Sequence, residues 1–340
     1  MSKRVYIAYT GGTIGMDNSS SGYLPRPGFL AAQMQAMPEL RAAGMPEYTL
    51  GEYTPLLDSS NITPQDWLRM AHDIAKHYEH HDGFIVLHGT DTMAYTASAL
   101  AFLLSELNKP VIVTGSQIPL SEVRNDARVN LITSLQIAGG LAIPRSIPEV
   151  CICFGSRLLR GCRAVKVNAD GFQAFDSPNF PPLGACGVDI QIDWKLVRPA
   201  PTESLAVKEL GNPQVAAMRI FPGMSAGVLA NILQPPLQGL VLETYGSGNG
   251  PDRDPALLAA LKDAVDRGVV IVNVTQCLTG AVDMAAYATG SGLQQAGVVG
   301  GYDLTAEAAL AKLYYLLGLG LAPEKVKSQM QQDLRGELTR

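Results

Sequence analysis

GFIVLHGTDTMAYTASALAFLLSELNKPVIVTG, residues 83–115, holds two short apolar runs on either side of a longer, alanine-rich segment. The runs at 83–89 and 110–115 are rich in aliphatic residues and end in glycine, which is typical of buried strands. The segment at 93–107 is long enough for a helix of about four turns. Because a helix between two buried strands forms a crossover connection, the stretch predicts a parallel strand pair.

The same alternation continues along the rest of the chain. Apolar, strand-like runs begin at residues 5, 215, 239 and 268, and helical patterns cover 64–79, 126–138, 225–233 and 255–267. Between 170 and 212 the alternation weakens, because prolines and polar residues interrupt it. We therefore expect an α/β fold with two domains. The first is a larger N-terminal open, mostly parallel sheet flanked by helices at 1–190, followed by a linker at 191–212 and a smaller C-terminal α/β domain at 213–340.

Composition and charge favour a small-molecule ligand. The 340 residues are 47% hydrophobic and carry a formal net charge of −5. Lysine and arginine form no dense cluster, so we expect no nucleic acid partner. No apolar run is long enough to span a bilayer, and only five apolar residues follow the basic pair at the start of the chain. We expect a cytoplasmic protein without a membrane partner.

Cysteine and histidine spacing does not indicate a metal site. The five cysteines lack CxxC or zinc-ligand spacing, so we interpret them as reduced core residues. His77 and His81 are four residues apart and could share a helix face. No acidic residue stands where a zinc protease helix requires one, so a solvated helix end is the simpler interpretation.

The first apolar run ends in TGGTIG, Thr10 to Gly15. Two adjacent glycines allow a tight turn with free backbone N–H groups, and Thr13 would project its hydroxyl from this turn. The alternative is a turn that holds a phosphate. The segment matches neither phosphate-binding glycine pattern, however, and no lysine follows it.

A second turn of the same kind follows the run at 83–87 and reads HGTDT, His88 to Thr92. Asp91 alone could be the N-cap of the following helix. That reading leaves the neighbouring hydroxyl groups unexplained. Ligands bind at the carboxyl ends of strands in open parallel sheets, so two such turns would place threonines and an acid around one crevice. Amide hydrolysis needs such a set of groups.

The chain resembles the bacterial-type L-asparaginases, in particular the cytoplasmic type I branch. The resemblance covers nearly the whole chain and rests on YTGGTIG at 9–15 and GFIVLHGTDTM at 83–93. It implies hydrolysis of L-asparagine to L-aspartate and ammonia through an acyl-enzyme, without a cofactor or a metal. It also implies self-association as a homodimer or homotetramer with the active site near a subunit interface.

The resemblance also implies a catalytic role for residues that match the family pattern. Thr13 corresponds to the nucleophile, and Tyr23 in SSGYLP corresponds to a tyrosine on a mobile loop, here the lid expected at 17–22. Thr90 and Asp91 form a second triad with a lysine that matches Lys166 in GCRAVKVNADGF. A tyrosine hydroxyl has a pKa of about 10, so Tyr23 would need a shift or a relay to act as a base near neutral pH.

Substrate binding follows from the same resemblance. Ser59, with Ser60 beside it, matches the serine that binds the α-carboxylate, and Asp91 would pair with the α-ammonium. Backbone N–H groups of the two threonine turns would meet the oxyanion. The loop at 114–117, which contains Ser116, would line the side of the amide nitrogen. In the secreted type II enzymes of the family, an acid from a neighbouring subunit completes the ammonium site. This sequence has no clear counterpart of that acid, and Asp283 is the nearest candidate.

Three other functions stay open at this point. One is a subunit that releases ammonia from glutamine for tRNA amidation. Another is a non-catalytic amino-acid sensor on the same scaffold, against which the presence of all five candidate catalytic residues argues. A nucleotide-binding module is the third, and the missing phosphate fingerprint argues against it. The sequence does not decide which threonine attacks first, and we predict that it is Thr13, with Thr90 acting in the second half-reaction or supporting the oxyanion.

Overall fold

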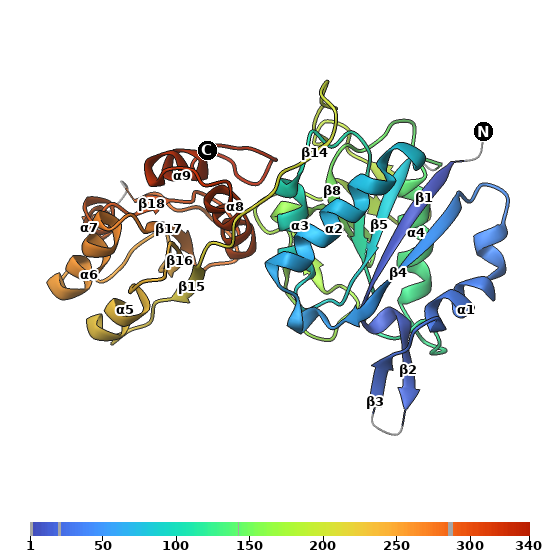
Figure 1. The fold of residues 1–340 in the computed structure, drawn as a ribbon, viewed down its shortest axis with the longest axis horizontal. Coiled ribbons are helices and arrows are strands. Elements are labelled where there is room, and N and C mark those ends of the chain that lie inside the picture. Colours follow the sequence, from blue (N-terminus) through green and yellow to red (C-terminus); the bar gives the residue numbers. More distant parts are fainter. Residues whose placement is uncertain (1–2, 20–21, 142, 285–287) are drawn as a thin grey trace. The chain divides into compact units, whose positions relative to one another are not determined.

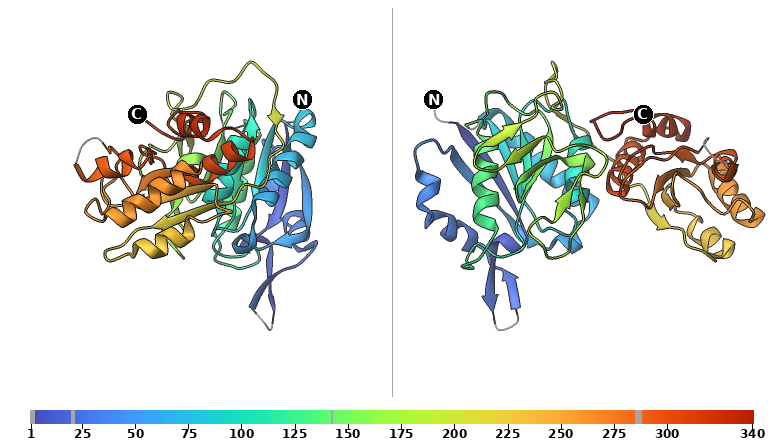
Figure 2. Two further views of the ribbon diagram at one scale, coloured as in Figure 1. Left: turned by 60° about the vertical axis from the view of Figure 1, so that its left-hand side comes forward. Right: turned by 180° about the vertical axis from the view of Figure 1, so that it is seen from behind.

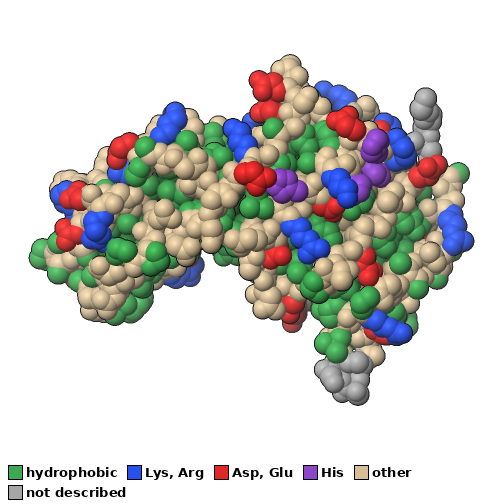
Figure 3. Space-filling view, in the orientation of Figure 1, with side chains coloured by type: hydrophobic (Ala, Val, Ile, Leu, Met, Phe, Trp, Pro, Cys, Tyr) green, Lys and Arg blue, Asp and Glu red, His purple; other side chains and the backbone are tan. Residues whose placement is uncertain are grey.

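The computed structural model describes residues 3–19, 22–141, 143–284 and 288–340. The chain forms two compact units, Met1–Val207 and Lys208–Arg340. No helix in these described ranges has the length and apolar character that crossing a membrane requires. On the face shown in Figure 3, acidic and basic side chains are interspersed, so no single-sign field covers this face.

The first unit is built on an eight-stranded sheet with the order β13-β12-β9-β8-β7-β5-β1-β4. Its five parallel strands are β4 (Glu47–Leu57), β1 (Arg4–Gly11), β5 (Gly83–Leu87), β7 (Val111–Thr114) and β8 (Val150–Phe154). Antiparallel strands extend one edge: β9 (Arg157–Arg160), β12 (Gly184–Cys186) and β13 (Ile190–Ile192). The next two strands of this sheet along the chain, β4 and β5, lie on opposite sides of β1. The carboxyl end of β1 is therefore a switch point, where open α/β sheets bind ligands.

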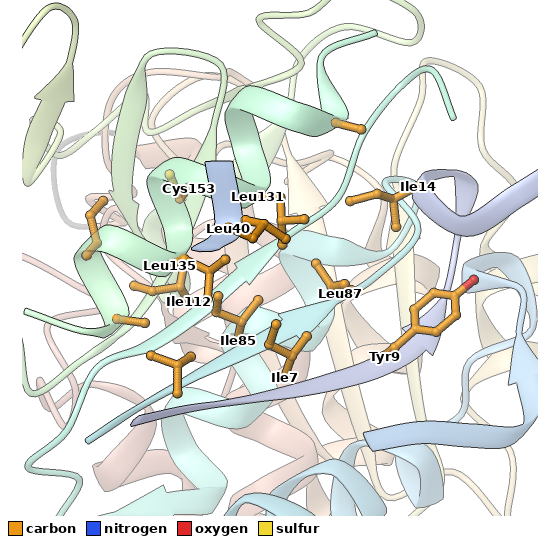
Figure 4. Close-up of a cluster of buried hydrophobic side chains, with 14 of the residues drawn as sticks. Ile7, Tyr9, Ile14, Leu40, Ile85, Leu87, Ile112, Leu131, Leu135 and Cys153 are labelled. Atoms are coloured by element: carbon orange, nitrogen blue, oxygen red, sulfur yellow. The ribbon is translucent and has the colours of Figure 1, made fainter. Parts of the chain in front are cut away.

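Helices cover both faces of this sheet. The helices α2 (Pro64–His77) and α3 (Met93–Leu103) lie on the face seen in Figure 1. The opposite face, seen in the right-hand view of Figure 2, carries α1 (Phe29–Gln35) and α4 (Ala127–Ala138). Figure 4 shows how Ile7, Ile85 and Ile112 of neighbouring strands point toward Leu131 and Leu135 of α4. All five side chains are fully buried, so the strands that end in the threonine turns pack closely against α4.

Shorter elements surround the sheet. β2 (Met16–Ser19) and β3 (Gly22–Pro25) form a hairpin that projects away from the first unit in Figure 1. Two further antiparallel pairs join β10 (Val165–Lys166) to β11 (Phe175–Asp176) and β6 (Leu104–Ser105) to β14 (Ala206–Val207).

The second unit is a smaller α/β layer structure. Its parallel sheet has the order β15 (Val215–Arg219), β16 (Gly239–Thr244), β17 (Val270–Thr275) and β18 (Val299–Gly300). One side packs on α5 (Ala226–Ile232) and α6 (Pro255–Asp266), through residues such as Leu229 and Leu261. The remaining helices are α7 (Ala288–Gln295), α8 (Ala306–Gly318) and α9 (Pro323–Met330). Both α8 and α9 contact the strands.

The structure confirms the predicted fold class and differs from the sequence analysis in detail. The helix expected at 93–107 ends at Leu103, because 104–105 pair with Ala206–Val207 as a short strand. Part of the segment expected to be a linker belongs to the first unit, since β13 and β14 pair with its strands. The sequence analysis assigned no element to α1 or to β4.

Candidate active site

Three turns of the first unit meet at the carboxyl ends of the central strands. They are the turn after β1 with Gly12, the turn after β5 with Gly89, and the 3₁₀ turn Ser59–Asn61 that follows β4. A Cβ atom on Gly12 would lie 2.7 Å from the Cα of Gly89, and a Cβ on Gly89 would lie 2.7 Å from the Cβ of Ser59. Only glycine at positions 12 and 89 allows this approach of the two backbones to each other and of Gly89 to the Ser59 side chain. The sheet therefore brings the two threonine turns and Ser59 together.

Thr13 begins the 3₁₀ turn η1 (Thr13–Gly15), which continues directly from β1. Gly12 precedes it with φ 86° and ψ 172°, a conformation that is essentially restricted to glycine. The N–H of Gly15 donates to the carbonyl of Gly12 at 3.3 Å, and Ile14 is buried in the core beneath the turn. The Thr13 side chain, in contrast, is only partly buried. The buried Ile14 thus anchors the turn in the core, while Thr13 keeps some exposure to solvent.

Thr90, Asp91 and Lys166 are in direct contact. The Lys166 ammonium donates to Thr90 Oγ1 at 2.9 Å and to Asp91 Oδ1 at 2.8 Å. Lys166 reaches this position from β10, which pairs with β11 in a separate small hairpin. Asp91 is not the N-cap of α3, since that position is Thr92. The structure thus joins Lys166 to two adjacent residues that lie 76 and 75 positions before it in the sequence.

Gln117 completes the surroundings of Thr90. Thr90 Oγ1 donates to Gln117 Oε1 at 3.2 Å, and Gln117 Nε2 donates to two carbonyls of the loop at 168–171. From the sequence, residue 117 was expected only as part of a loop that lines the site, without a role for its side chain.

His88 holds the second threonine turn from the interior. Its ring lies between Thr96 Oγ1, at 2.9 Å from Nε2, and the Gly89 carbonyl, at 2.6 Å from Nδ1. A carbonyl only accepts, so the network assigns the proton to Nδ1 and leaves Nε2 to accept from Thr96, which in turn accepts from Trp67 Nε1 at 3.1 Å. Burial lowers the pKa of His88 to about 4. The ring is therefore a neutral support for the turn.

Tyr23 lies on β3 and its hydroxyl donates to Glu122 Oε1 at 2.9 Å, not to Thr13. This hydrogen bond raises the pKa of Tyr23 above its ordinary value. The tyrosine is 44% exposed on the projecting hairpin. Residues 20–21 of the expected lid lie outside the described residues. In this arrangement Tyr23 is a neutral hydrogen-bond donor to Glu122.

The predicted substrate-binding serines occupy different positions. Ser59 is 4% exposed, and its backbone carbonyl accepts from Thr92 Oγ1 at 2.7 Å. Ser60 is exposed and donates to Asp58 at 2.8 Å, whereas Ser116 is buried and donates to the Ile118 carbonyl at 2.7 Å. Ser59 therefore lies at the meeting point of the turns, and the hydroxyls of the other two serines are engaged within their own loops.

The candidate metal ligands are occupied in other ways. His77 stacks on Tyr6 with ring centroids 3.9 Å apart, and the Nδ1 atom of His81 lies 3.0 Å from the His77 carbonyl. In the described ranges no three His, Cys, Asp or Glu side chains are arranged to hold a metal ion. All five cysteines are free thiols, of which Cys186 is partly exposed and Cys277 is exposed.

Several residues of the site escaped the sequence analysis, among them Gln117, Glu122 and His88. The available signals were weak. His88 directly follows β5, and Gln117 lies in the loop that follows β7, at the strand ends where ligand-binding residues concentrate. Nothing in the sequence pairs Glu122 with Tyr23, which lies 99 residues away.

Comparison with known proteins agrees with the geometry. Two family models match the chain: "Asparaginase, N-terminal" over residues 4–198 and "Glutaminase/Asparaginase C-terminal domain" over residues 214–330. L-asparaginase 1 of Escherichia coli (strain K12) is 50% identical over 337 residues, covering 99% of this chain and 98% of that protein. The 60 kDa lysophospholipase of Mus musculus is 44% identical over 359 residues, covering 99% of this chain and 63% of that protein. The crystal structure of L-asparaginase I from Vibrio cholerae O1 biovar eltor str. N16961 has a TM-score of 0.93 at 49% identity and covers both chains completely. With one family model matching more than half of its length and a second matching most of the remainder, the chain belongs to the asparaginase family.

Proposed function

We propose that the chain is an L-asparagine amidohydrolase, which converts L-asparagine and water to L-aspartate and ammonia. The observation that carries the proposal is the contact of Lys166 with both Thr90 and Asp91, next to the turn that holds Thr13. An ammonium group, a carboxylate and two threonines around one crevice suit the hydrolysis of an amide on a zwitterionic substrate.

The proposed reaction has two halves. Thr13 Oγ attacks the amide carbon, its proton passes to the leaving nitrogen, and ammonia departs from an aspartyl ester on Thr13. Water then adds to the ester carbon and the Thr13 oxygen leaves with a proton, which releases aspartate. Tyr23 assists Thr13 in this scheme, and Thr90, with Lys166 and Asp91, acts in the second half or supports the oxyanion. Backbone N–H groups at the two turns stabilise the oxyanion, a contribution of about 3 kcal/mol per donor.

Substrate anchoring is proposed from the same turns. Ser59, with Ser60 beside it, binds the α-carboxylate, Asp91 pairs with the α-ammonium, and the loop of Ser116 faces the amide nitrogen. The position of Ser59 against Gly89 supports its role. Asp91 has a 65% exposed side chain, so one carboxylate oxygen remains accessible to an ammonium group.

The test is ammonia release by the purified chain in EDTA, with L-asparagine and L-glutamine compared over a wide concentration range. We expect release from asparagine that survives the chelator, and a loss of several orders of magnitude in Thr13→Ala and Thr90→Ala. Thr202→Ala, at an exposed position outside the site, is the matched control and should keep full activity. Faster release from glutamine would favour the glutamine-hydrolysing function.

Two further outcomes would overturn the proposal. Binding of asparagine without ammonia release would identify an amino-acid sensor. Lysophosphatidylcholine is included as a substrate because the mouse relative is named a lysophospholipase, and fatty-acid release without asparagine hydrolysis would change the assignment. We also propose a cytoplasmic homodimer or homotetramer, which light scattering after size-exclusion chromatography distinguishes from a monomer.

A further inference from the structure

The side chain of Gln117 connects the Thr90 hydroxyl to the loop that follows Lys166. Its Oε1 accepts from Thr90 Oγ1 at 3.2 Å. Its Nε2 donates to the carbonyls of Ala169 at 3.2 Å and Gly171 at 3.1 Å. A single amide therefore contacts both segments that supply the second triad.

These contacts determine which way the amide faces. Both hydrogens of Nε2 go to backbone carbonyls, and a carbonyl has no hydrogen to donate. A flipped amide would place its oxygen against those two carbonyl oxygens and lose both bonds. The Gln117 oxygen must therefore face Thr90, and in this pair the hydroxyl of Thr90 is the donor.

The orientation of the Thr90 hydroxyl follows from its two neighbours. A hydroxyl has one hydrogen and two lone pairs. The hydrogen points to Gln117, and one lone pair accepts from the Lys166 ammonium at 2.9 Å. The second lone pair is left as an acceptor for another donor. Without Gln117 the hydrogen could turn in that direction, and Thr90 would present a donor in place of an acceptor.

Gln117 itself is held by a buried polar network. Its backbone N–H donates to the Asp126 carboxylate at 3.0 Å, and the N–H of Ile118 donates to the same group at 3.1 Å. Asn130, which is 1% exposed, binds Asp126 and the Gly115 carbonyl through Nδ2. Asp126 is the N-cap residue of α4. The amide thus rests on a rigid element, as a positioning group requires.

We propose that Gln117 is a positioning residue for the second half-reaction: it takes the Thr90 hydrogen so that Thr90 accepts a hydrogen bond from the water that hydrolyses the acyl-enzyme. The inference rests on the proposed function and deepens it. In this step a bond forms between the water oxygen and the ester carbon, and the ester bond to Thr13 breaks. One hydrogen of the water ends on the Thr13 oxygen, and aspartate leaves.

The test compares Gln117→Met, which removes both donor and acceptor at similar size, with Gln117→Glu, which keeps an acceptor for Thr90 but loses the two bonds to the carbonyls of Ala169 and Gly171. Gln191→Met, at an exposed position in β13, is the matched control. We measure melting temperature, steady-state kcat and KM for L-asparagine, and ammonia release in the first turnover by rapid quench. The first-turnover measurement separates ester formation from ester hydrolysis.

For Gln117→Met we expect kcat to fall about tenfold or more, with a burst of one ammonia per active site before the slow steady state. KM should fall with kcat, because the acyl-enzyme accumulates. Gln117→Glu should hydrolyse the acyl-enzyme faster than Gln117→Met because it keeps the acceptor for Thr90, and it should stay below the wild type because the two bonds to the loop carbonyls are lost. Gln191→Met should match the wild type. Loss of activity without a burst, or loss that follows the melting temperatures of both variants, would overturn the inference. A wild-type chain that releases no ammonia from asparagine would overturn the proposed function instead.

Discussion

The substitution Gly12→Ala tests whether the close approach of the two threonine turns is needed for activity. An added Cβ would lie 2.7 Å from both the Cα of Gly89 and the carbonyl carbon of His88, whereas ordinary contact begins at 3.4 Å. The added Cβ would lie closer still to the Gly89 nitrogen, so the turns must separate by at least about 0.7 Å, the difference between 3.4 and 2.7 Å. Both atoms belong to the backbone of the neighbouring turn, so no flexible side chain can absorb the displacement.

The expected loss follows from this displacement. Misplacing reacting groups by about 1 Å can cost about 100-fold in rate, so we expect kcat/KM to fall between about tenfold and 100-fold. Alanine at φ 86° and ψ 172° is also strained, which should lower the free energy of unfolding by about 1–3 kcal/mol. Gly28→Ala is the control, because Gly28 has φ 74° but nothing within 4 Å of its added Cβ.

The assay pairs ammonia release from L-asparagine with urea unfolding followed by circular dichroism, at a temperature where both variants are folded. Gly28→Ala should lose some stability through its positive φ and keep its kcat/KM. The reasoning would be refuted if Gly12→Ala retained the kcat/KM of Gly28→Ala while folded, since the separation of the turns would then not matter.

Three further predictions concern charged and titrating side chains. Lys166→Met should reduce turnover by about 100-fold or more. It should change the unfolding free energy by less than about 1 kcal/mol, because the ion-pair partner Asp91 is largely exposed. A larger loss of stability in urea would contradict this. Lys312→Met should cost about 3–5 kcal/mol in urea unfolding, because it removes the ammonium partner of the fully buried Glu337 carboxylate, whose remaining donors include the backbone N–H groups of Leu334 and Arg335. His88 stays neutral in the folded protein down to about pH 4, whereas the unfolded chain binds the proton below 6.5. The contribution of neutral His88 to the free energy of unfolding is therefore complete above pH 6.5 and falls by about 3 kcal/mol as the pH drops to 4. If the unfolding free energy of a His88→Gln variant depended on pH between 7 and 4.5 as that of the wild type does, His88 would not be the cause.

The central part of the fold could be predicted because it depends on strong local patterns. The apolar runs at 5–9, 83–87 and 111–114 become β1, β5 and β7, which lie side by side and run parallel. Once parallel strands are adjacent, the turns at their carboxyl ends must be neighbours. The sequence analysis could therefore place the threonine turns around one crevice without knowing any tertiary contact.

The elements without a strong pattern could not be predicted in this way. β4 (Glu47–Leu57) lies at the edge of the sheet and contains glutamate, glycine and proline, so its apolar periodicity is poor. α1 (Phe29–Gln35) has only seven residues, too few for a clear helical period. Both are stabilised by tertiary contacts, such as the burial of Leu30 and Met34 against the β1 face of the core.

The two halves of the candidate site differ in how far they are assembled. The Thr90 hydroxyl already has Lys166 and Gln117 as partners, both held by hairpin or helix contacts. Tyr23, which we propose assists Thr13, is instead bound to Glu122 on an exposed hairpin. An exposed hydrogen bond is a weak restraint, because water competes for both groups. Under the proposed mechanism, Tyr23 must therefore exchange its bond to Glu122 for a contact with Thr13 in the first half-reaction. The Thr90 hydroxyl already has the partners that we propose for it in the second.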